Sequence, residues 1–190
     1  MNLKNILNRL EFRHISLLSN VQLNKILFIR NEKNIRNNMV TKHIITQKEH
    51  IKWINSFRKS KNNFFYAVFY LDKIIGGVGI YDVNNVNKIS HWAFYISSLI
   101  KINGLGAALE FKALKFSFKK FKIDRLICLV FNYNSEVIKL HKKFGFLEIS
   151  CNKSIIFNTK NIVDNDTTCL SLSSYLWVKK EKEMIKKYFN

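Results

Sequence analysis

The stretch Lys101-Ile102-Asn103-Gly104-Leu105-Gly106-Ala107-Ala108 decides how this chain is interpreted. Its two glycines stand one residue apart, and a segment with a helical pattern follows at once. Glycine lets a backbone approach a ligand closely, and a helix N-terminus offers free N–H groups and the positive end of the helix dipole. The stretch therefore predicts a loop that binds an anionic group such as a pyrophosphate.

A second short helix is expected further along the chain, over Ser135–Phe144. Asn134 or Ser135 can cap its start, and Gly145 suits the left-handed position that closes a helix. The glycine loop and this helix are separated by an apolar run of strand length. The ordered pair is more informative than either part alone.

The remaining elements follow from the spacing of apolar side chains and from turn residues. In the first half of the chain the pattern predicts a loop or broken helix through Ile26–Asn38, a helix over Gln47–Arg58, and a hairpin of Phe64–Leu71 and Ile74–Tyr81 with a turn at Asp72-Lys73. Around the glycine loop it predicts a strand over Ile89–Ser97, a helix over Ala107–Phe121 and a buried strand over Arg125–Phe131. Towards the C-terminus it predicts strands at Ser154–Asn158 and Cys169–Val178 and a charged helix over Lys179–Tyr188.

This order predicts an α/β (α+β) fold, a single domain with a mixed, mostly antiparallel central sheet flanked by helices. We place the domain at residues 1–178 and treat 179–190 as a charged C-terminal helix or tail. A length of 190 residues, with 47% apolar content, supports one core. No apolar run reaches the roughly 18 residues of a membrane span, and the N-terminus lacks a signal-peptide pattern. We therefore expect a cytoplasmic protein without a membrane partner.

The cysteines predict reduced thiols. Cys128, Cys151 and Cys169 are odd in number, widely spaced and without a Cys-x-x-Cys pair. Neither a disulfide framework nor a zinc site is supported, and we expect no metal. Cys128 stands in the expected buried strand, where apolar surroundings keep a thiol protonated, so we expect a core cysteine rather than a nucleophile.

The formal net charge of +19 invites a nucleic-acid interpretation, because Lys and Arg supply the salt-sensitive part of such binding. The chain also has no proline, although average usage is about 5%. Abundant Lys, Asn, Ile and Phe without proline indicate an AT-rich coding sequence. Much of the charge is then compositional drift at surface positions, compatible with anionic ligands but not diagnostic of a partner.

The glycine loop, the strand before it and the later segment Asn134…Gly145-Phe146 together resemble the GNAT superfamily of N-acetyltransferases, where Lys101 is a mild departure from the usual Arg or Gln. A closer resemblance, over Leu27–Ile149, is to the UDP-4-amino-sugar N-acetyltransferases of the pseudaminic acid pathway. The segments that carry it are Ile29–Met39, His43–Ile45, Glu49-His50, Trp92–Tyr95 and Ile138–Phe146. That family acetylates the 4-amino group of a UDP-linked dideoxy sugar used in bacterial surface glycans.

The resemblance implies acetyl-CoA as the donor and direct transfer within a ternary complex. It implies that the cofactor is held at Phe94, Tyr95, Ile96, Lys101, Asn103, Gly104, Leu105, Gly106, Ala107 and Asn134. It places the acceptor at Arg30, Asn31 and Met39, with Arg30 pairing with a phosphate of the UDP group. It also implies that His141 protonates the coenzyme A thiolate, for which an ordinary pKa of about 6.5 is suitable.

Several of these positions also have a purely structural interpretation. Gly104 and Gly106 could form a simple turn, although the order of strand, loop and helix favours a binding loop. Asn134 could cap the following helix while also holding the cofactor. His141 could be a histidine packed on the core, and we weigh its two interpretations equally.

Other candidates are weaker. Arg30 could be a solvated side chain beside a packed Met39, although we favour the binding role. His43, His50 and His91 could each act as a base, but a structural role is the better expectation for any one of them.

Two positions depart from the closer family. Leu129 stands where those enzymes commonly carry a glutamate near the acceptor, and Val40 follows Met39 where tyrosine is usual. A different amino sugar or a loss of activity would explain both.

Two alternatives to the sugar acetyltransferase remain. One is a GNAT enzyme that acetylates a protein N-terminus or another small amine. The other is a basic nucleic-acid-binding protein with a vestigial acetyl-CoA site, which requires Lys and Arg to form one face. We expect small-molecule partners, acetyl-CoA and a UDP-amino sugar, rather than nucleic acid, and leave a homodimer open.

Overall fold

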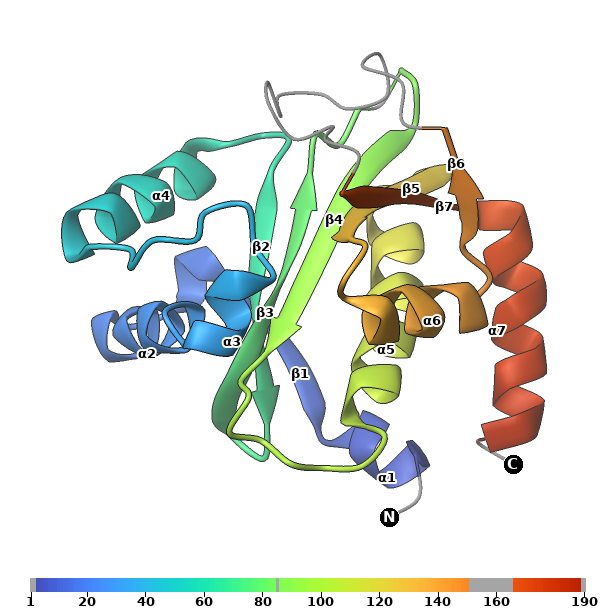
Figure 1. Cartoon of the computed structure of the whole chain (residues 1–190), viewed down its shortest axis with the longest axis horizontal. Helices are drawn as coiled ribbons and strands as arrows, with labels where there is room; N and C mark the ends of the chain where they lie inside the picture. The colour runs from blue at the N-terminus through green and yellow to red at the C-terminus, as the bar shows by residue number, and fades with distance from the viewer. Residues whose placement is uncertain (1–2, 85, 151–165, 189–190) are drawn as a thin grey trace. The chain divides into compact units, whose positions relative to one another are not determined.

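The computed structural model describes residues 3–84, 86–150 and 166–188 (Figure 1). Cys151 and the strand expected at Ser154–Asn158 lie outside these residues. The chain divides into two compact units. The first unit is Met1–Tyr81 with Ala93–Glu110, and the second unit is Asp82–Trp92 with Phe111–Asn190.

The described residues form a seven-stranded sheet with the strand order β1-β2-β3-β4-β5-β7-β6. Its strands are β1 (Leu10–His14), β2 (Phe64–Tyr70), β3 (Lys73–Tyr81), β4 (Ile89–Ile96), β5 (Arg125–Phe131), β6 (Leu147–Ile149) and β7 (Thr167–Ser173). β1 with β2, β2 with β3, β5 with β7 and β6 with β7 are antiparallel pairs, whereas β4 and β5 are parallel. The expected mixed, mostly antiparallel α/β sheet is confirmed.

In the first unit, β2 and β3 form the expected hairpin, with Phe64 opposite Ile80 and Tyr70 opposite Lys73. The turn lies one residue earlier than expected, at Leu71 and Asp72, whose φ values are 48° and 61°. Left-handed values at both central residues fit a tight hairpin turn that follows the twist of the strands. β1 pairs with β2, and the sequence pattern did not predict this strand.

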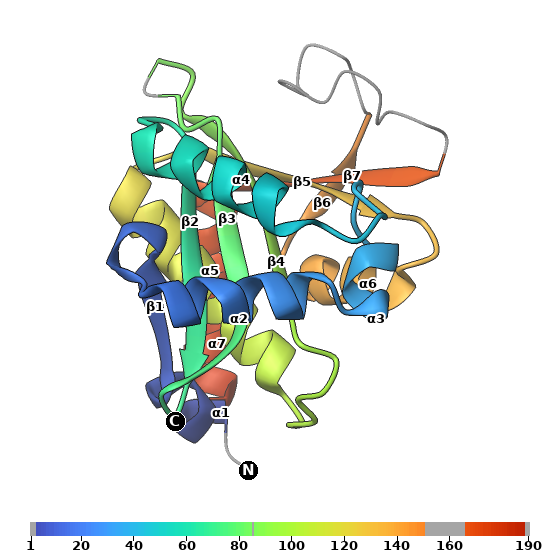
Figure 2. The same cartoon turned by 90° about the vertical axis from the view of Figure 1, so that its left-hand side faces the viewer.

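Helices α2 (Asn20–Arg30) and α4 (Gln47–Lys59) lie against β2 and β3 (Figure 2). Buried side chains of both helices and both strands form one core cluster, which includes Ile26, Ile54, Phe65 and Phe69. The short helices α1 (Leu3–Asn8) and α3 (Lys33–Asn37) and the 3-10 turn Ile15–Leu17 complete this unit. The pair α2 and α3 accounts for the broken helix expected before Asn38.

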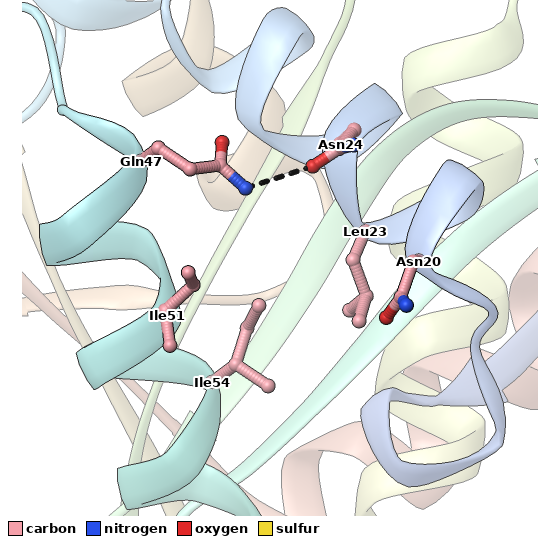
Figure 3. Close-up of a pocket in the computed structure, with 6 residues that line it drawn as sticks. All are labelled: Asn20, Leu23, Asn24, Gln47, Ile51 and Ile54. Carbon is pink, nitrogen blue, oxygen red and sulfur yellow. Dashed lines mark hydrogen bonds between the residues drawn. The ribbon is translucent and has the colours of Figure 1, made fainter.

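A pocket of about 330 Å³ lies between α2 and α4 in the first unit (Figure 3). Its lining is Asn20, Leu23, Asn24, Gln47, Ile51 and Ile54, and Gln47 Nε2 donates to Asn24 Oδ1 across it at 3.0 Å. Because this lining includes none of the predicted site residues, the pocket does not mark the expected chemistry.

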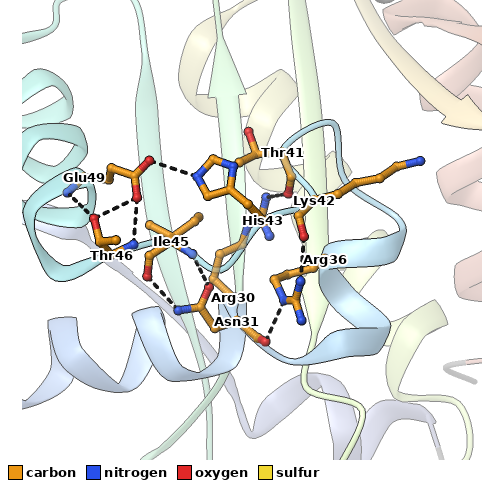
Figure 4. Close-up of polar contacts among 9 residues, drawn as sticks. All are labelled: Arg30, Asn31, Arg36, Thr41, Lys42, His43, Ile45, Thr46 and Glu49. Atoms are coloured by element: carbon orange, nitrogen blue, oxygen red, sulfur yellow. Dashed lines mark hydrogen bonds and ion pairs between the residues drawn. The ribbon is translucent and has the colours of Figure 1, made fainter.

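The N-terminus of α4 is fixed by a capping box. The Thr46 hydroxyl accepts from the Glu49 N–H at 3.3 Å, and Glu49 Oε2 accepts from the Thr46 N–H at 2.8 Å. The other carboxylate oxygen of Glu49 lies 2.9 Å from His43 Nε2 (Figure 4). Hydrogen bonds from Thr46 and then from His43 lower the pKa of the Glu49 carboxyl from 4.5 to about 2.

In the second unit, β5 and β7 pair along their whole length, from Arg125 opposite Ser173 to Phe131 opposite Thr167. The strand expected through Val178 ends instead at Ser173, and α7 runs over Ser174–Tyr188. The prediction was wrong because the apolar run Tyr175–Val178 continues the strand pattern. In α7, Trp177 and Met184 stand two helical turns apart and are both buried. Trp177 packs against Phe111 and Phe118 of α5 (Leu105–Phe121).

The short helix α6 (Ser135–Lys143) was expected in this unit and is present. Gly145 closes it with a φ of +94°, as predicted. The side chain of Asn134 makes no capping hydrogen bond, so the expected side-chain cap is wrong. None of the helices that the structure describes is long and apolar enough to span a membrane.

Gly76 of β3 lets two backbones of the first unit approach closely. A Cβ at this position would stand 2.0 Å from the Tyr95 carbonyl oxygen and 3.1 Å from Ile96 Cα. We therefore expect Gly76→Ala to lower the free energy of unfolding by about 2 to 3 kcal/mol, because backbone must move to admit the methyl group. Urea denaturation measures this loss.

Gly77→Ala is the matched control, because its added Cβ meets the ring of Phe65 at 2.3 Å rather than a backbone atom. A ring can turn aside, so we expect a smaller loss. Equal losses for the two variants would contradict the importance of the backbone contact.

The capping box predicts a pH-dependent contribution to stability. The pKa of Glu49 is lowered in the folded chain, so its contribution is complete above about pH 4.5 and is lost as the pH falls toward 2. We expect Glu49→Ala to be less stable than the parent at pH 7 and the difference to shrink progressively below pH 4.5. Urea denaturation across this range measures both proteins.

Gln47→Ala, in the same helical turn but without a carboxylate, serves as the control and should differ from the parent by the same amount at every pH. If the cost of Glu49→Ala were also constant with pH, the account of the Glu49 pKa would be wrong.

Candidate functional site

The glycine loop leads directly into α5 in the first unit. Gly104 has a φ of +84°, a left-handed value that glycine adopts without strain. The Leu105 N–H donates to the Ile102 carbonyl at 3.1 Å, and the Ala108 N–H donates to the Gly104 carbonyl at 2.9 Å. α5 therefore begins at Leu105, two residues earlier than expected.

The loop is accessible on one side and anchored on the other. Lys101, Asn103 and Gly104 are exposed, whereas Leu105 is 2% exposed and packs into the core. The first N–H groups of a helix have no acceptor within the helix. With the positive end of the α5 dipole behind them, these groups suit an anionic ligand.

The end of β4 supplies the other predicted cofactor residues. Phe94, Tyr95 and Ile96 are half-buried, and the Ser97 N–H donates to the Ile75 carbonyl of β3 at 2.7 Å. The Tyr95 ring packs on the core cluster of the first unit, 6.4 Å from Phe65 between ring centroids. Burial raises the pKa of the Tyr95 hydroxyl, so this phenol stays neutral.

Arg30 and Asn31 hold the loop between α3 and α4 (Figure 4). The Asn31 side chain donates to the Ile45 carbonyl at 2.9 Å and accepts from the Ile45 N–H at 2.8 Å. Arg30 Nη2 donates to the Thr41 carbonyl at 3.2 Å, and Arg36 Nη1 donates to the Lys42 carbonyl at 2.6 Å. The amide of Asn31 is thus engaged within the protein, and its predicted contact with the acceptor remains a prediction.

Arg30 retains one donor that the protein does not use. Its Nη1 is buried and has no hydrogen-bond partner among the described residues. Burial lowers the pKa of Arg30, while the nearby hydroxyls of Tyr95 and Tyr81 oppose the shift. Burial also raises the pKa of Tyr81 to about 12. A guanidinium remains charged under these conditions, so an anionic group beside Nη1 would satisfy a buried donor.

Met39, the third predicted acceptor residue, is partly buried against the core cluster of the first unit. Its neighbour Val40 is 57% exposed. The contact of Met39 with the acceptor remains a prediction, and Val40 offers no hydroxyl at the adjacent position.

The second unit holds the other two predicted residues, each described within that unit. The Asn134 carbonyl accepts the N–H groups of Val137 and Ile138, so the backbone of Asn134 begins α6 while its amide is not used as a cap. His141 is 4% exposed and packs against the rings of Trp92 and Phe146, with centroids 5.4 and 5.1 Å away. The packed position of His141 is confirmed, and its role as an acid remains a prediction.

Other candidates take structural positions. His50 is 4% exposed, and this burial lowers the pKa of its imidazole. Its Nε2 lies 2.9 Å from the Leu23 carbonyl. Cys128 is 4% exposed in β5, as expected of a core cysteine, and Leu129 is half-buried beside it. The described residues contain no group of three His, Cys, Asp or Glu side chains able to hold a metal.

One cluster of the first unit was not predicted. Glu32 accepts hydrogen bonds from Ser97 and Ser98, which stand just before the glycine loop. The only local signal is the Ser-Ser pair at the end of a strand. Glu32 precedes Ser97 by 65 positions and Ser98 by 66 positions in the sequence. Local sequence patterns do not reveal contacts at such a separation.

Three solved structures share this fold. The Campylobacter jejuni N-acetyltransferase PseH with acetyl coenzyme A is 19% identical, with 87% of this chain and 99% of that one covered and a TM-score of 0.65. The Vibrio cholerae spermidine N-acetyltransferase with CoA and spermine is 17% identical, with 90% and 99% covered and a TM-score of 0.74. FdhC, a nucleotide-linked sugar GNAT, is 19% identical, with 96% and 94% covered and a TM-score of 0.72.

No curated protein matches the sequence. The family comparison is decisive, because residues 32–146, more than half of the chain, match the acetyltransferase (GNAT) family. These residues include the glycine loop, β4, α5 and the segment with Asn134 and His141. By sequence match and by fold, the chain belongs to the acetyltransferase (GNAT) family.

Proposed function

We propose that this acetyltransferase transfers the acetyl group of acetyl-CoA to the amine of a UDP-linked 4-amino-dideoxy sugar. The observation that carries the proposal is the exposed loop that ends at Gly104, a left-handed residue directly before α5. The unused donor of Arg30 in the same unit supports an anionic acceptor.

The loop suits the diphosphate of acetyl-CoA. Backbone N–H groups of Asn103, Gly104, Gly106 and Ala107 would donate to the pyrophosphate, as a helix N-terminus does for other phosphates. The Leu105 N–H already donates to the Ile102 carbonyl. Lys101 is exposed and adds a cation at the start of the loop. The backbone of Phe94, Tyr95 and Ile96 would pair with the pantetheine arm. The role of Asn134 in holding the cofactor stays a prediction from the resemblance.

The charges of the first unit are compatible with an anionic acceptor. This unit has fifteen Lys and Arg residues against five Asp and Glu residues. Glu11 and Asp72 pair with Arg13, Glu32 is held by two serines, and Glu49 is held by Thr46 and His43. Glu110, the fifth, is fully buried. The net positive charge of this unit is compatible with the approach of a diphosphate.

The fold alone does not choose between these acceptors, because PseH, FdhC and the spermidine enzyme all share it at under 20% identity. The residue pattern over Leu27–Ile149 that resembles the UDP-4-amino-sugar enzymes supports the sugar, and so does the surplus of positive charge. A protein N-terminus or another small amine is the alternative acceptor within the family.

The proposed chemistry is a direct transfer. The neutral amine attacks the thioester carbonyl, an amide C–N bond forms, the C–S bond breaks, and the thiolate needs a proton. His141 is the proposed donor of that proton. Leu129 supplies no carboxylate, so the amine loses its proton to water or to another group.

A nucleic-acid-binding role is the alternative from another class, and it requires Lys and Arg to form one continuous face. Lys or Arg is present on each of the described α-helices, from Lys4 on α1 to Lys187 on α7. A spread over all of these helices is what AT-rich composition predicts.

The proposal predicts acceptor-dependent release of coenzyme A. Purified protein with acetyl-CoA should release free thiol when UDP-4-amino-4,6-dideoxy-N-acetyl-altrosamine is added, and spermidine should give less than a tenth of that rate. A thiol-reactive dye measures release. A faster reaction with spermidine, or binding of acetyl-CoA with no acceptor-dependent release, would reject this acceptor.

Gly104→Ala should weaken coenzyme A binding. A side chain at a φ of +84° costs about 1 to 2 kcal/mol, and relief of that strain would turn the loop N–H groups away from the diphosphate. We expect the Kd for coenzyme A to rise about tenfold in isothermal titration calorimetry, in line with that cost.

Gly145→Ala is the matched control, because its φ of +94° makes it equally strained but it lies outside the loop. This variant should lose similar stability and keep its affinity for coenzyme A within about twofold. Equal weakening in both variants would indicate general destabilisation rather than a binding loop.

A further inference from the structure

Glu32 makes the densest set of side-chain hydrogen bonds near the glycine loop. Its Oε1 accepts from the Ser97 hydroxyl at 2.5 Å, and its Oε2 accepts from the Ser98 N–H at 2.7 Å and from the Ser98 hydroxyl at 2.8 Å. Glu32 precedes α3, yet its side chain does not cap that helix. Hydrogen bonds to a carboxylate are stronger than those between neutral groups, so this contact fixes both serines firmly.

The two serines begin the turn that carries the chain from β4 to the loop. The Ser97 carbonyl accepts from the Ile100 N–H at 3.1 Å, and the Ser97 hydroxyl accepts from the Leu99 N–H at 3.3 Å. Lys101 follows immediately. The orientation of the loop therefore depends on the position of Ser97 and Ser98, which Glu32 sets.

The residues next to Glu32 hold a second loop of the first unit, residues 41–45. Arg30 and Asn31, the two residues before Glu32, bind the backbone at Thr41 and Ile45. Three consecutive residues at the junction of α2 and α3 thus contact two segments, 41–45 and 97–98. Displacement of this junction would disturb both segments together.

We propose that Glu32 is a positioning residue that sets the orientation of the coenzyme A loop and links its order to that of the 41–45 loop. The inference rests on the proposed function in that coenzyme A binds the loop Lys101–Ala107. Glu32 does not touch the cofactor and acts through Ser98. By linkage, coenzyme A binding then stabilises the 41–45 loop, and the reverse also holds.

Glu32→Gln tests the proposal. Glutamine keeps the size of the side chain but has one carbonyl oxygen, so it cannot accept all three hydrogen bonds. We expect the Kd for coenzyme A to rise about tenfold by calorimetry, with faster hydrogen exchange at the Ser98 amide. In the parent, coenzyme A should slow exchange at the Ile45 amide, and this effect should be absent in Glu32→Gln.

Two further variants keep the test decisive. Glu11→Gln removes a carboxylate of the same unit that pairs with Arg13, and it should leave coenzyme A binding unchanged. Ser98→Ala removes one partner hydroxyl and should weaken binding about threefold, even if Glu32→Gln fails to fold. In the double variant Glu32→Gln with Ser98→Ala, binding should be no weaker than in Glu32→Gln alone.

The outcomes separate this inference from the function on which it rests. Faster exchange at Ser98 with unchanged coenzyme A affinity would show a structural contact only and overturn the positioning role. Slower exchange at Ile45 upon coenzyme A binding in both proteins would overturn the link between the loops. Absence of coenzyme A binding in the parent would reject the proposed function itself.

Discussion

The left-handed backbone of Gly104 is the constraint on which the proposed cofactor site depends. Gly104 ends the segment that follows β4, and α5 begins at the next residue. Leu105 is buried there, whereas Asn103 and Gly104 are exposed. A side chain would resist this φ value, and a later helix start would move the free N–H groups. Two other contacts of the first unit support this junction. The missing side chain of Gly76 lets the backbone of β4 approach closely, and Glu32 accepts a hydrogen bond from Ser97 just after β4.

The segment of the first unit where we propose that the acceptor binds is held by polar contacts to backbone. Arg30, Asn31 and Arg36 hold the loop between α3 and α4 by its carbonyl and N–H groups. This leaves one buried donor of Arg30 beside two neutral phenols. The surplus of positive charge in this unit is compatible with the negatively charged acceptor that we propose.

Local sequence patterns predicted most of the fold. The hairpin, α4, β5 and α6 were identified because their signals are local: a capping box, a tight turn, an apolar run and a closing glycine. β1 was missed because its pairing partner lies more than fifty residues away, and α7 was placed too late because its buried Trp177 extended an apolar strand pattern.

In the candidate site, too, local features could be predicted and long-range contacts could not. The spacing of two glycines located the loop in which Gly104 adopts its positive φ, and the burial of His141 fits a helical histidine on the core. The engagement of Asn31 with Ile45 and of Glu32 with Ser98 could not be foreseen, because each joins segments that only the folded chain brings together. Sequence spacing thus locates the loop, whereas tertiary contacts determine which neighbouring side chains remain available.

The most direct test of the central claim is an amide NMR titration of the protein with coenzyme A. If the loop holds the diphosphate, the largest changes in N–H chemical shift fall on Asn103 to Ala107, and they saturate together with the calorimetric binding curve. Saturable binding with these amides unchanged, and with the largest changes elsewhere in the chain, would contradict the account.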